Sequence, residues 1–318
     1  MKTVQNLFAM LLALLMMVQP CPAWSECGHH IIAILAFDQM EPADQQRVIE
    51  LLKKHPRFAD DFKPPQGVWK VQESARWYIG RAGYWPDVAR RQPEFNRPNW
   101  HYQLGSSLTI GHDVKVPETP GALPETADLR TKDLHIAQAI ELCRRTLRSE
   151  TAADSDKAIA VCWIAHLVAD AHQPCHAGSL YVEGIFPAGD RGANSIPTKQ
   201  SQNLHALWDG MLGNRYDAGD IDRRVAEIRR NVPRTDETEA AVKSLEPVGW
   251  LAESSEFGKS HVYSREVLDA VEAARRAGAE KVETVDLSVE YLKAAGALAQ
   301  ERAAFAGRRL AAIFSEDL

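Results

Sequence analysis

The chain has 318 residues, of which 45% are hydrophobic and 25% are charged, and its formal net charge at pH 7 is −6. This length suits one large domain or two small ones. The acidic balance excludes a general electrostatic attraction to nucleic acid or to anionic membranes, so any phosphate group has to be bound at a local site.

The first residues have the pattern of a secretory signal peptide. Lys2 gives a basic start, residues 7–18 form a continuous apolar run, and Ala23 ends a short stretch of small residues suited to cleavage. The run is too short to span a membrane, and no later run replaces it. We therefore predict a signal peptide over residues 1–23, one domain over residues 24–318, no stable membrane anchor, and a periplasmic or secreted location.

The rest of the chain is predicted to be mainly helical. Apolar spacing indicates helices over residues 42–55, 134–147, 156–172, 203–212, 219–231, 238–254, 263–276 and 287–314. Two long stretches, 105–132 and 177–202, lack a helical period and are predicted to be loops. No run alternates convincingly between apolar and polar residues, so the predicted fold class is all-α, without a sheet.

Histidine and aspartate recur together inside these apolar helices. His166 and Asp170 stand four residues apart and therefore project from one helical face. Pro174 ends that helix, which lets His176 turn towards the same centre. His205 and Asp209 repeat the four-residue spacing. A buried histidine satisfied by a carboxylate would explain one such pair, but repetition favours a site with several zinc ions, because buried ionisable groups are costly unless something pairs with them.

Four cysteines follow the predicted signal peptide: Cys27, Cys143, Cys162 and Cys175. Four cysteines in an exported protein suggest two disulfides. The first and last stand beside His29 and His176, so a Cys27–Cys175 bridge is plausible if both histidines join one cluster. Cys143 and Cys162 would then pair across neighbouring helices. Buried free thiols are the alternative.

Several short motifs occur together along the chain. They are Trp24…Gly28-His29, Trp85-Pro86-Asp87, Trp100-His101, His166-x-x-x-Asp170-x-His172-Gln173-Pro174-x-His176, Asp190-x-Gly192-x-Asn194 and Asn203-Leu204-His205-x-x-Trp208-Asp209. In this order and spacing they resemble the zinc-dependent single-strand nucleases of the S1/P1 type. Residues 290–312 also resemble the closing helix of that family. The resemblance implies the helical bundle shared by these nucleases and phospholipase C, with a cleft that holds three zinc ions.

The resemblance also implies which residues bind zinc (Zn²⁺). One zinc ion would be held by Asp87, His101, His166 and Asp170. A second would be held by His29 and by the amino nitrogen and carbonyl oxygen of Trp24, with Asp170 bridging the two ions. The third would be held by His176, His205 and Asp209. Histidine and carboxylate are suitable zinc ligands, and positions left to water are typical of a catalytic site.

Three residues are predicted to take part in catalysis by the same resemblance. Asp87 is the expected general base, Arg90 is expected to pair with a phosphate oxygen, and Asn194 is expected to donate to the phosphate in the transition state. A solvated charge at Arg90 and a loop cap at Asn194 are the alternatives. Tyr102 follows His101 where some members carry a base-stacking aromatic, although packing would also explain it.

The function that the resemblance implies is hydrolysis of single-stranded DNA and RNA to 5′-phosphate products by a monomer. Nucleotides would also be substrates, through release of a 3′-phosphate. The nearest alternative is a zinc-dependent phospholipase C, which shares the bundle and the tryptophan ligand. Another is a non-catalytic zinc-binding surface protein. No His-Glu-x-x-His motif occurs, which argues against a zinc protease.

Overall fold

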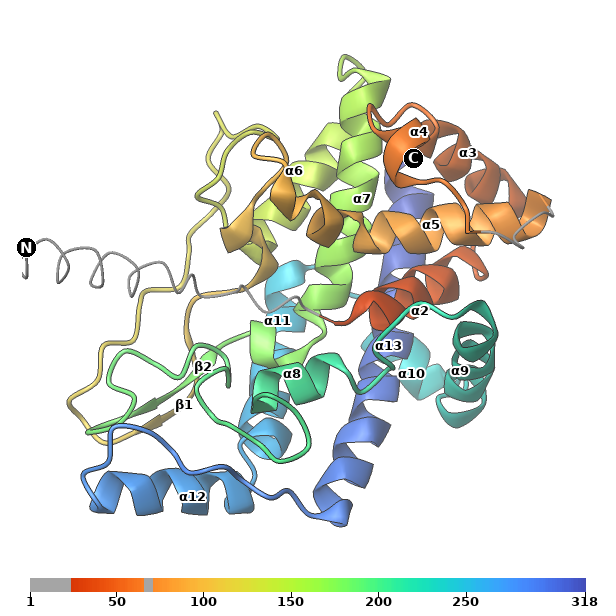
Figure 1. Cartoon of the computed structure of the whole chain (residues 1–318). Helices are drawn as coiled ribbons and strands as arrows, with labels where there is room; N and C mark the ends of the chain where they lie inside the picture. The colour runs from red at the N-terminus through yellow and green to blue at the C-terminus, as the bar shows by residue number, and fades with distance from the viewer. Residues whose placement is uncertain (1–23, 66–70) are drawn as a thin grey trace, which may run out of the picture.

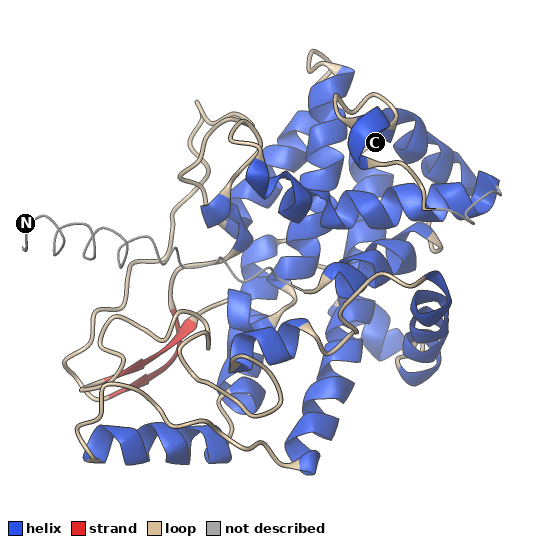
Figure 2. Cartoon of the chain, in the orientation of Figure 1, coloured by secondary structure: helices blue, strands red, loops and turns tan. Residues whose placement is uncertain are grey.

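The computed structural model describes residues 24–65 and 71–318, so the predicted signal peptide lies outside the described residues. Helices make up most of the chain (Figure 2), which confirms the predicted all-α class. Among the described residues, no helix is both long and apolar enough to cross a bilayer.

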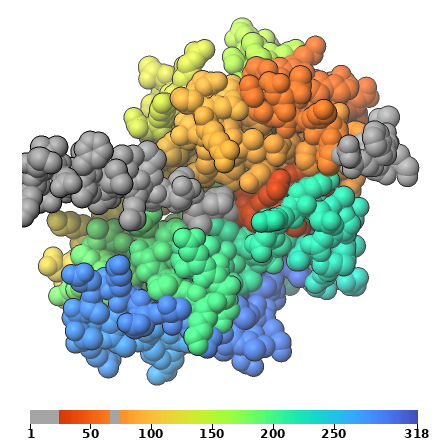
Figure 3. All heavy atoms as spheres, in the orientation of Figure 1, coloured from red at the N-terminus to blue at the C-terminus, as the bar shows by residue number. Residues whose placement is uncertain are grey.

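Helix α7 (Asp154–Ala171) lies at the centre of the fold. It contacts α2 (Glu26–Phe37), α5 (Val71–Val88), α6 (Ile136–Arg148) and the long closing helix α13 (Val289–Asp317) (Figure 1). The second half of α7 and almost all of α2 are buried on every side, because both helices are apolar around most of their circumference. In Figure 3, α2 is visible only in a small area between the first half of the chain above and the second half below.

Glycines allow two helices to approach α2 closely. A Cβ atom at Gly83 of α5 would lie 3.1 Å from the carbonyl oxygen of His29, and one at Gly307 of α13 would lie 2.8 Å from the Cβ of Leu35. At its start, α2 is capped by Ser25, whose hydroxyl accepts a hydrogen bond from the backbone N–H of Gly28 at 3.3 Å. The backbone of α2 is therefore fixed against both neighbours.

The remaining helices surround this core. They are α3 (Pro42–Leu52), α4 (Phe58–Asp61), α8 (Leu204–Asp209), α9 (Ala218–Asn231), α10 (Asp236–Ala241), α11 (Pro247–Phe257) and α12 (Arg265–Arg276). Short turns of 3₁₀ helix cover Ala89–Arg91, Pro98–His101 and Pro174–His176, and a π-turn covers Gly258–Val262. The single helix predicted over residues 238–254 is wrong: it is divided into α10 and α11, because the residue before Pro247 is extended and proline disfavours a helical conformation there.

The prediction that the chain has no sheet is also wrong. Strands β1 (Ser106–Ile110) and β2 (Ser179–Val182) form a two-stranded parallel sheet, in which Ile110 pairs with Val182. Both strands lie in stretches predicted to be loops. Such short strands, far apart in the sequence, are stabilised by tertiary packing rather than by their own pattern. A second apolar cluster forms between this sheet and α12.

Neither predicted disulfide is present, because Cys27, Cys143 and Cys162 are buried free thiols. Cys27 belongs to the main core, whereas Cys175 belongs to the second apolar cluster. Cys143 and Cys162 pack inside the main core on α6 and α7, where a thiol behaves as a small apolar side chain. Burial raises the pKa of Cys27 to about 11 and raises that of the other two thiols as well.

Candidate metal centre and active site

Helix α7 presents His166 and Asp170 together on its buried face. The Nε2 atom of His166 lies 3.2 Å from Oδ2 of Asp170. The other ring nitrogen, Nδ1, lies 2.7 Å from the carbonyl oxygen of Gly83 on α5. Because a carbonyl only accepts, Nδ1 carries a proton, and Nε2 is the ring nitrogen turned towards Asp170 and the other candidate ligands.

Residues from three other segments meet this pair. Two sets of candidate metal ligands overlap at His166: His29, Asp87 and His166 form one, and His101, His166 and Asp170 form the other. Within each set the ligand atoms lie within 4.8 Å of one another. Asp170 has Oδ1 at 3.4 Å from Nε2 of His29 and Oδ2 at 3.2 Å from Nδ1 of His101. Its two oxygens thus face different histidines, which suits a carboxylate shared between two metal ions.

A third ligand set consists of His176, His205 and Asp209, all of them buried. The Nε2 atoms of His176 and His205 are 3.1 Å apart, and Nε2 of His205 lies 3.5 Å from Oδ2 of Asp209. The Nδ1 atom of His205 donates to the carbonyl oxygen of Gly192 at 2.5 Å, and Nδ1 of His176 donates to that of His101. Both rings therefore turn Nε2 towards the shared centre.

The buried polar atoms of these sets fit a bound metal. Atoms without a hydrogen-bond partner are Nδ1 and Nε2 of His29, Nε2 of His101, Oδ2 of Asp87 and Oδ1 of Asp170. Leaving such atoms buried and unpaired is costly. Burial also lowers the pKa values of His29, His101 and His176 well below the usual range, and that of His205 to about 4. These imidazoles are therefore neutral, which is the form that binds metal, and the donor set suits zinc.

Trp24 anchors the start of the described chain beside these sets. Its buried indole donates through Nε1 to the carbonyl oxygen of Ala169 on α7 at 3.0 Å. The backbone N–H of Ser25 donates to the carbonyl oxygen of Asp209 at 3.0 Å. The backbone of Trp24 thus lies between α7 and α8, although its role as a zinc ligand stays a prediction.

A cavity of about 590 Å³ opens beside the ligand sets. His101, His176 and His205 line it, together with the cationic side chains of Arg90, Lys115 and Arg191. Among the described residues that line this cavity there is neither aspartate nor glutamate. In a protein with a net charge of −6, such a lining is selective for anions.

Two of the three predicted catalytic residues, Arg90 and Asn194, line this space, and the third, Asp87, is bonded to Arg90. Arg90 donates through Nε to Oδ1 of Asp87 at 2.6 Å, while its buried Nη2 has no hydrogen-bond partner. Asn194 lines the cavity, and its amide donates to the carbonyl oxygen of Arg191 at 2.9 Å. Lys115 was missed by sequence reasoning, because it belongs to an irregular stretch and to none of the motifs.

The loop that carries Asn194 has an unusual backbone. Arg191, Gly192 and Ala193 have φ values of 63°, 60° and 68°, in the left-handed region that costs energy for residues other than glycine. Asp190 holds the loop in place, since its buried Oδ1 accepts from the backbone N–H of Leu180 at 3.0 Å and from a tyrosine hydroxyl at 3.1 Å. Backbone strain kept in this way is typical of functional loops.

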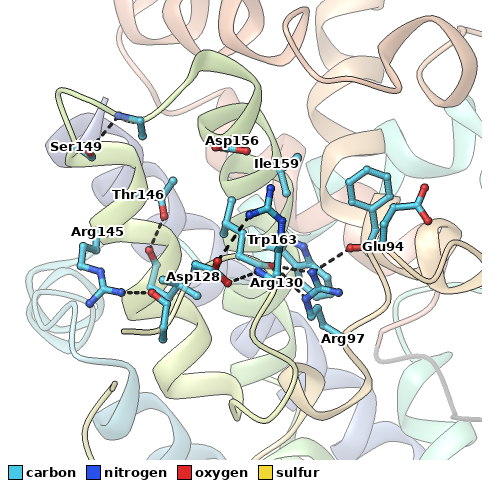
Figure 4. A pocket seen from close by; sticks show the side chains of 15 residues that line it. Glu94, Arg97, Asp128, Arg130, Arg145, Thr146, Ser149, Asp156, Ile159 and Trp163 are labelled. Carbon is cyan, nitrogen blue, oxygen red and sulfur yellow. Dashed lines mark hydrogen bonds and ion pairs between the residues drawn. The ribbon is translucent and has the colours of Figure 1, made fainter. Parts of the chain in front are cut away.

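A second cavity of about 600 Å³ lies on the other side of Trp163 (Figure 4). The indole of Trp163 contacts His101, with ring centroids 5.5 Å apart. Two of the arginines that line this cavity bind backbone carbonyls: Arg97 donates to Leu129, and Arg145 donates to Ala127 at 2.6 Å. These bonds fasten the segment 127–130, and no candidate ligand set found among the described residues belongs to this cavity.

The helical fold and the three candidate ligand sets define a helical protein whose potential metal ligands are gathered and buried between helices. A family model described as S1/P1 Nuclease matches residues 24–318, so the chain belongs to the S1/P1 nuclease family. It is 24% identical to Endonuclease 4 of Arabidopsis thaliana over 217 residues and 23% identical to Endonuclease 3 of the same plant over 210 residues. Each comparison covers 64% of this chain, and the chain spans 60% and 58% of the two relatives.

Proposed function

We propose that this protein is a zinc-dependent endonuclease that hydrolyses phosphodiester bonds in single-stranded DNA and RNA and leaves 5′-phosphates. The observation that carries the proposal is the cavity beside the ligand sets. Its described lining combines three candidate metal-binding histidines with three cations and contains no acid. Membership of the nuclease family and the similarity to two plant endonucleases support it.

Three zinc ions are assigned as the resemblance implies. Asp87, His101, His166 and Asp170 would hold one ion, His29 and the backbone of Trp24 would hold a second with Asp170 shared, and His176, His205 and Asp209 would hold the third. Bound zinc would lower the pKa of a water molecule and neutralise charge on the phosphate. Asp170 faces His29 with Oδ1 and His101 with Oδ2, so its carboxylate could contribute to both of the first two zinc sites. The third set is held apart on α8 and on the turn Pro174–His176.

The side chains around the centre have separate tasks. Oδ1 of Asp87 is held by Arg90, and its buried Oδ2 has no hydrogen-bond partner. Asp87 is assigned two roles, as a zinc ligand and, beside the attacking water, as the general base that takes its proton. The unpaired Nη2 of Arg90 can donate to a phosphate oxygen. The amide of Asn194, at the cavity wall, can donate to a second oxygen as charge develops.

The exposure of Tyr102 beside the cavity supports a preference for single strands. Tyr102 lines the cavity with 37% of its surface exposed, which leaves a ring face available for stacking. A base can stack there only when it is splayed out of a strand, and single strands allow this at little cost. Release of a 3′-phosphate from nucleotides, action as a monomer, and export after removal of residues 1–23 belong to the same proposal.

The experiment combines zinc content with activity. The mature protein is analysed for metal and tested on single-stranded DNA, duplex DNA, RNA and phosphatidylcholine, each with and without a chelator. We expect about three zinc ions per chain and chelator-sensitive cleavage of single strands. Hydrolysis of the lipid alone would identify a phospholipase instead. Full zinc content with no hydrolysis of any substrate would contradict enzymatic activity.

Replacement of Lys115 tests whether an anionic substrate binds in the cavity. Lys115→Ala removes one cation from the cavity, so KM for an oligonucleotide should rise and the salt dependence of binding should weaken by about one phosphate contact. Lys53→Ala is the matched control, because Lys53 pairs with Glu50 on the exposed face of α3. Equal behaviour of the two variants would show that Lys115 does not contact the substrate.

A further inference from the structure

Gln173 lies between α7 and the turn Pro174–His176, and it is fully buried. Both ends of its side-chain amide are used. Nε2 donates to Oδ1 of Asp209 at 2.7 Å, and Oε1 accepts from the backbone N–H of Cys175 at 2.5 Å. One side chain that is not itself a candidate ligand therefore joins the two segments that carry the third ligand set.

This double contact fixes the orientation of two ligands. With Oδ1 of Asp209 bound to Gln173, Oδ2 is the oxygen that faces Nε2 of His205, at 3.5 Å. The bond to Cys175 closes the turn whose next residue is His176. The primary amide donates to the carboxylate and accepts from the backbone at the same time, whereas an ionised glutamate lacks the donor, and methionine lacks the donor and offers only a weak acceptor.

The position of Gln173 is itself fixed from outside the site. His172, the preceding residue, is buried and accepts at Nε2 from Nη1 of Arg309 on α13 at 2.8 Å. Arg309 in turn binds Glu253 of α11 at 2.7 Å. The hydroxyl of Ser254 donates to the carbonyl oxygen of Ala171 at 2.6 Å. Helices α11 and α13 thus hold the end of α7, which is what a side chain needs if it is to orient others.

We propose that Gln173 is a positioning residue for the third ligand set, which holds the carboxylate of Asp209 and the turn of His176 in the orientation that binds one metal ion. The inference rests on the proposed metal centre. Residues that orient metal ligands typically contribute 10- to 100-fold in metal affinity. The backbone N–H of Gln173 donates to the carbonyl oxygen of Asp170, but its side-chain amide bonds Asp209 and Cys175. Because a substitution changes only the side-chain contacts, only the third site should weaken.

The test is a zinc titration of metal-free protein against a competing chelator. The variants are Gln173→Glu, which keeps the shape and removes the donor, and Gln173→Met, which removes both polar contacts. Gln45→Met is the matched control, since the amide of Gln45 donates to the carbonyl oxygen of Phe37 at 2.7 Å on the far side of the core. Cobalt(II) absorption of the same proteins reports the geometry of the third site without any measurement of activity.

We expect Gln45→Met to bind three ions, each with the same affinity as in wild type. Both Gln173 variants should bind two ions as tightly as wild type and the third about 10- to 100-fold more weakly, with an altered cobalt spectrum. Equal affinity at all three sites, or equal weakening at all three, would overturn the positioning role, because the latter is what a general loss of structure predicts. Wild-type protein that binds no zinc would instead overturn the metal centre itself.

Discussion

Replacement of Gly192 by alanine tests how the loop beside the cavity supports the site. Gly192 has a φ of 60°, and its carbonyl oxygen accepts the hydrogen bond from Nδ1 of His205 at 2.5 Å. A Cβ atom there would overlap the carbonyl oxygen of Cys175, which is backbone and cannot rotate away. Gly192→Ala therefore forces the loop to move, and the partner of His205 moves with it.

The expected loss of stability has two parts, and a second glycine of the chain allows them to be measured separately. The left-handed conformation costs a non-glycine residue about 1–2 kcal/mol. The overlap with Cys175 adds about 1–3 kcal/mol, as overpacking does in well-packed interiors. Gly278 has nearly the same φ, 62°, with no atom within 4 Å of its Cβ position, so Gly278→Ala carries only the first part. At roughly 2 °C per kcal/mol for a chain of this size, we expect Tm to fall by about 2–4 °C for Gly278→Ala and about 4–10 °C for Gly192→Ala.

The assay is thermal unfolding of metal-free and zinc-loaded protein, followed by nuclease activity. Gly192→Ala should also weaken zinc binding at the third ligand set, whereas Gly278→Ala should leave zinc binding and activity unchanged. If the two variants lose the same stability and both keep full zinc affinity, the loop does not support His205 in the way described.

Two further predictions concern stability. Burial lowers the pKa of His55 to about 4, so its contribution to folding is complete above pH 6.5 and is lost as the pH falls towards 4, by about 1.4 kcal/mol per pH unit. Urea unfolding of metal-free protein should show that the free energy of unfolding depends less steeply on pH in His55→Leu than in wild type. An unchanged pH dependence would refute this prediction. Glu253→Gln should lower the free energy of unfolding by about 3 kcal/mol, because the buried guanidinium groups of Arg302 and Arg309 lose their carboxylate. Glu316→Gln, at the exposed partner of Arg144, should change it by less than about 0.5 kcal/mol, and equal losses in the two variants would contradict this difference.

The sequence by itself determined the helical class and the composition of two ligand pairs. His166 with Asp170, and His205 with Asp209, are pairs whose geometry depends only on local helical spacing, so their juxtaposition could be read before any fold was known. The proline after Gln173 likewise marks the end of α7. Local rules of this kind need no information from distant parts of the chain.

Tertiary structure decided the features that depend on distant contacts. The strands β1 and β2 pair although neither has a clear pattern, and the thiol of Cys27 is buried in a different cluster from Cys175. Lys115 enters the cavity, and Gln173 reaches Asp209, only because segments far apart in the sequence are packed together. The local sequence thus indicates which residues can form the site, whereas the contacts that support them depend on which helices pack side by side.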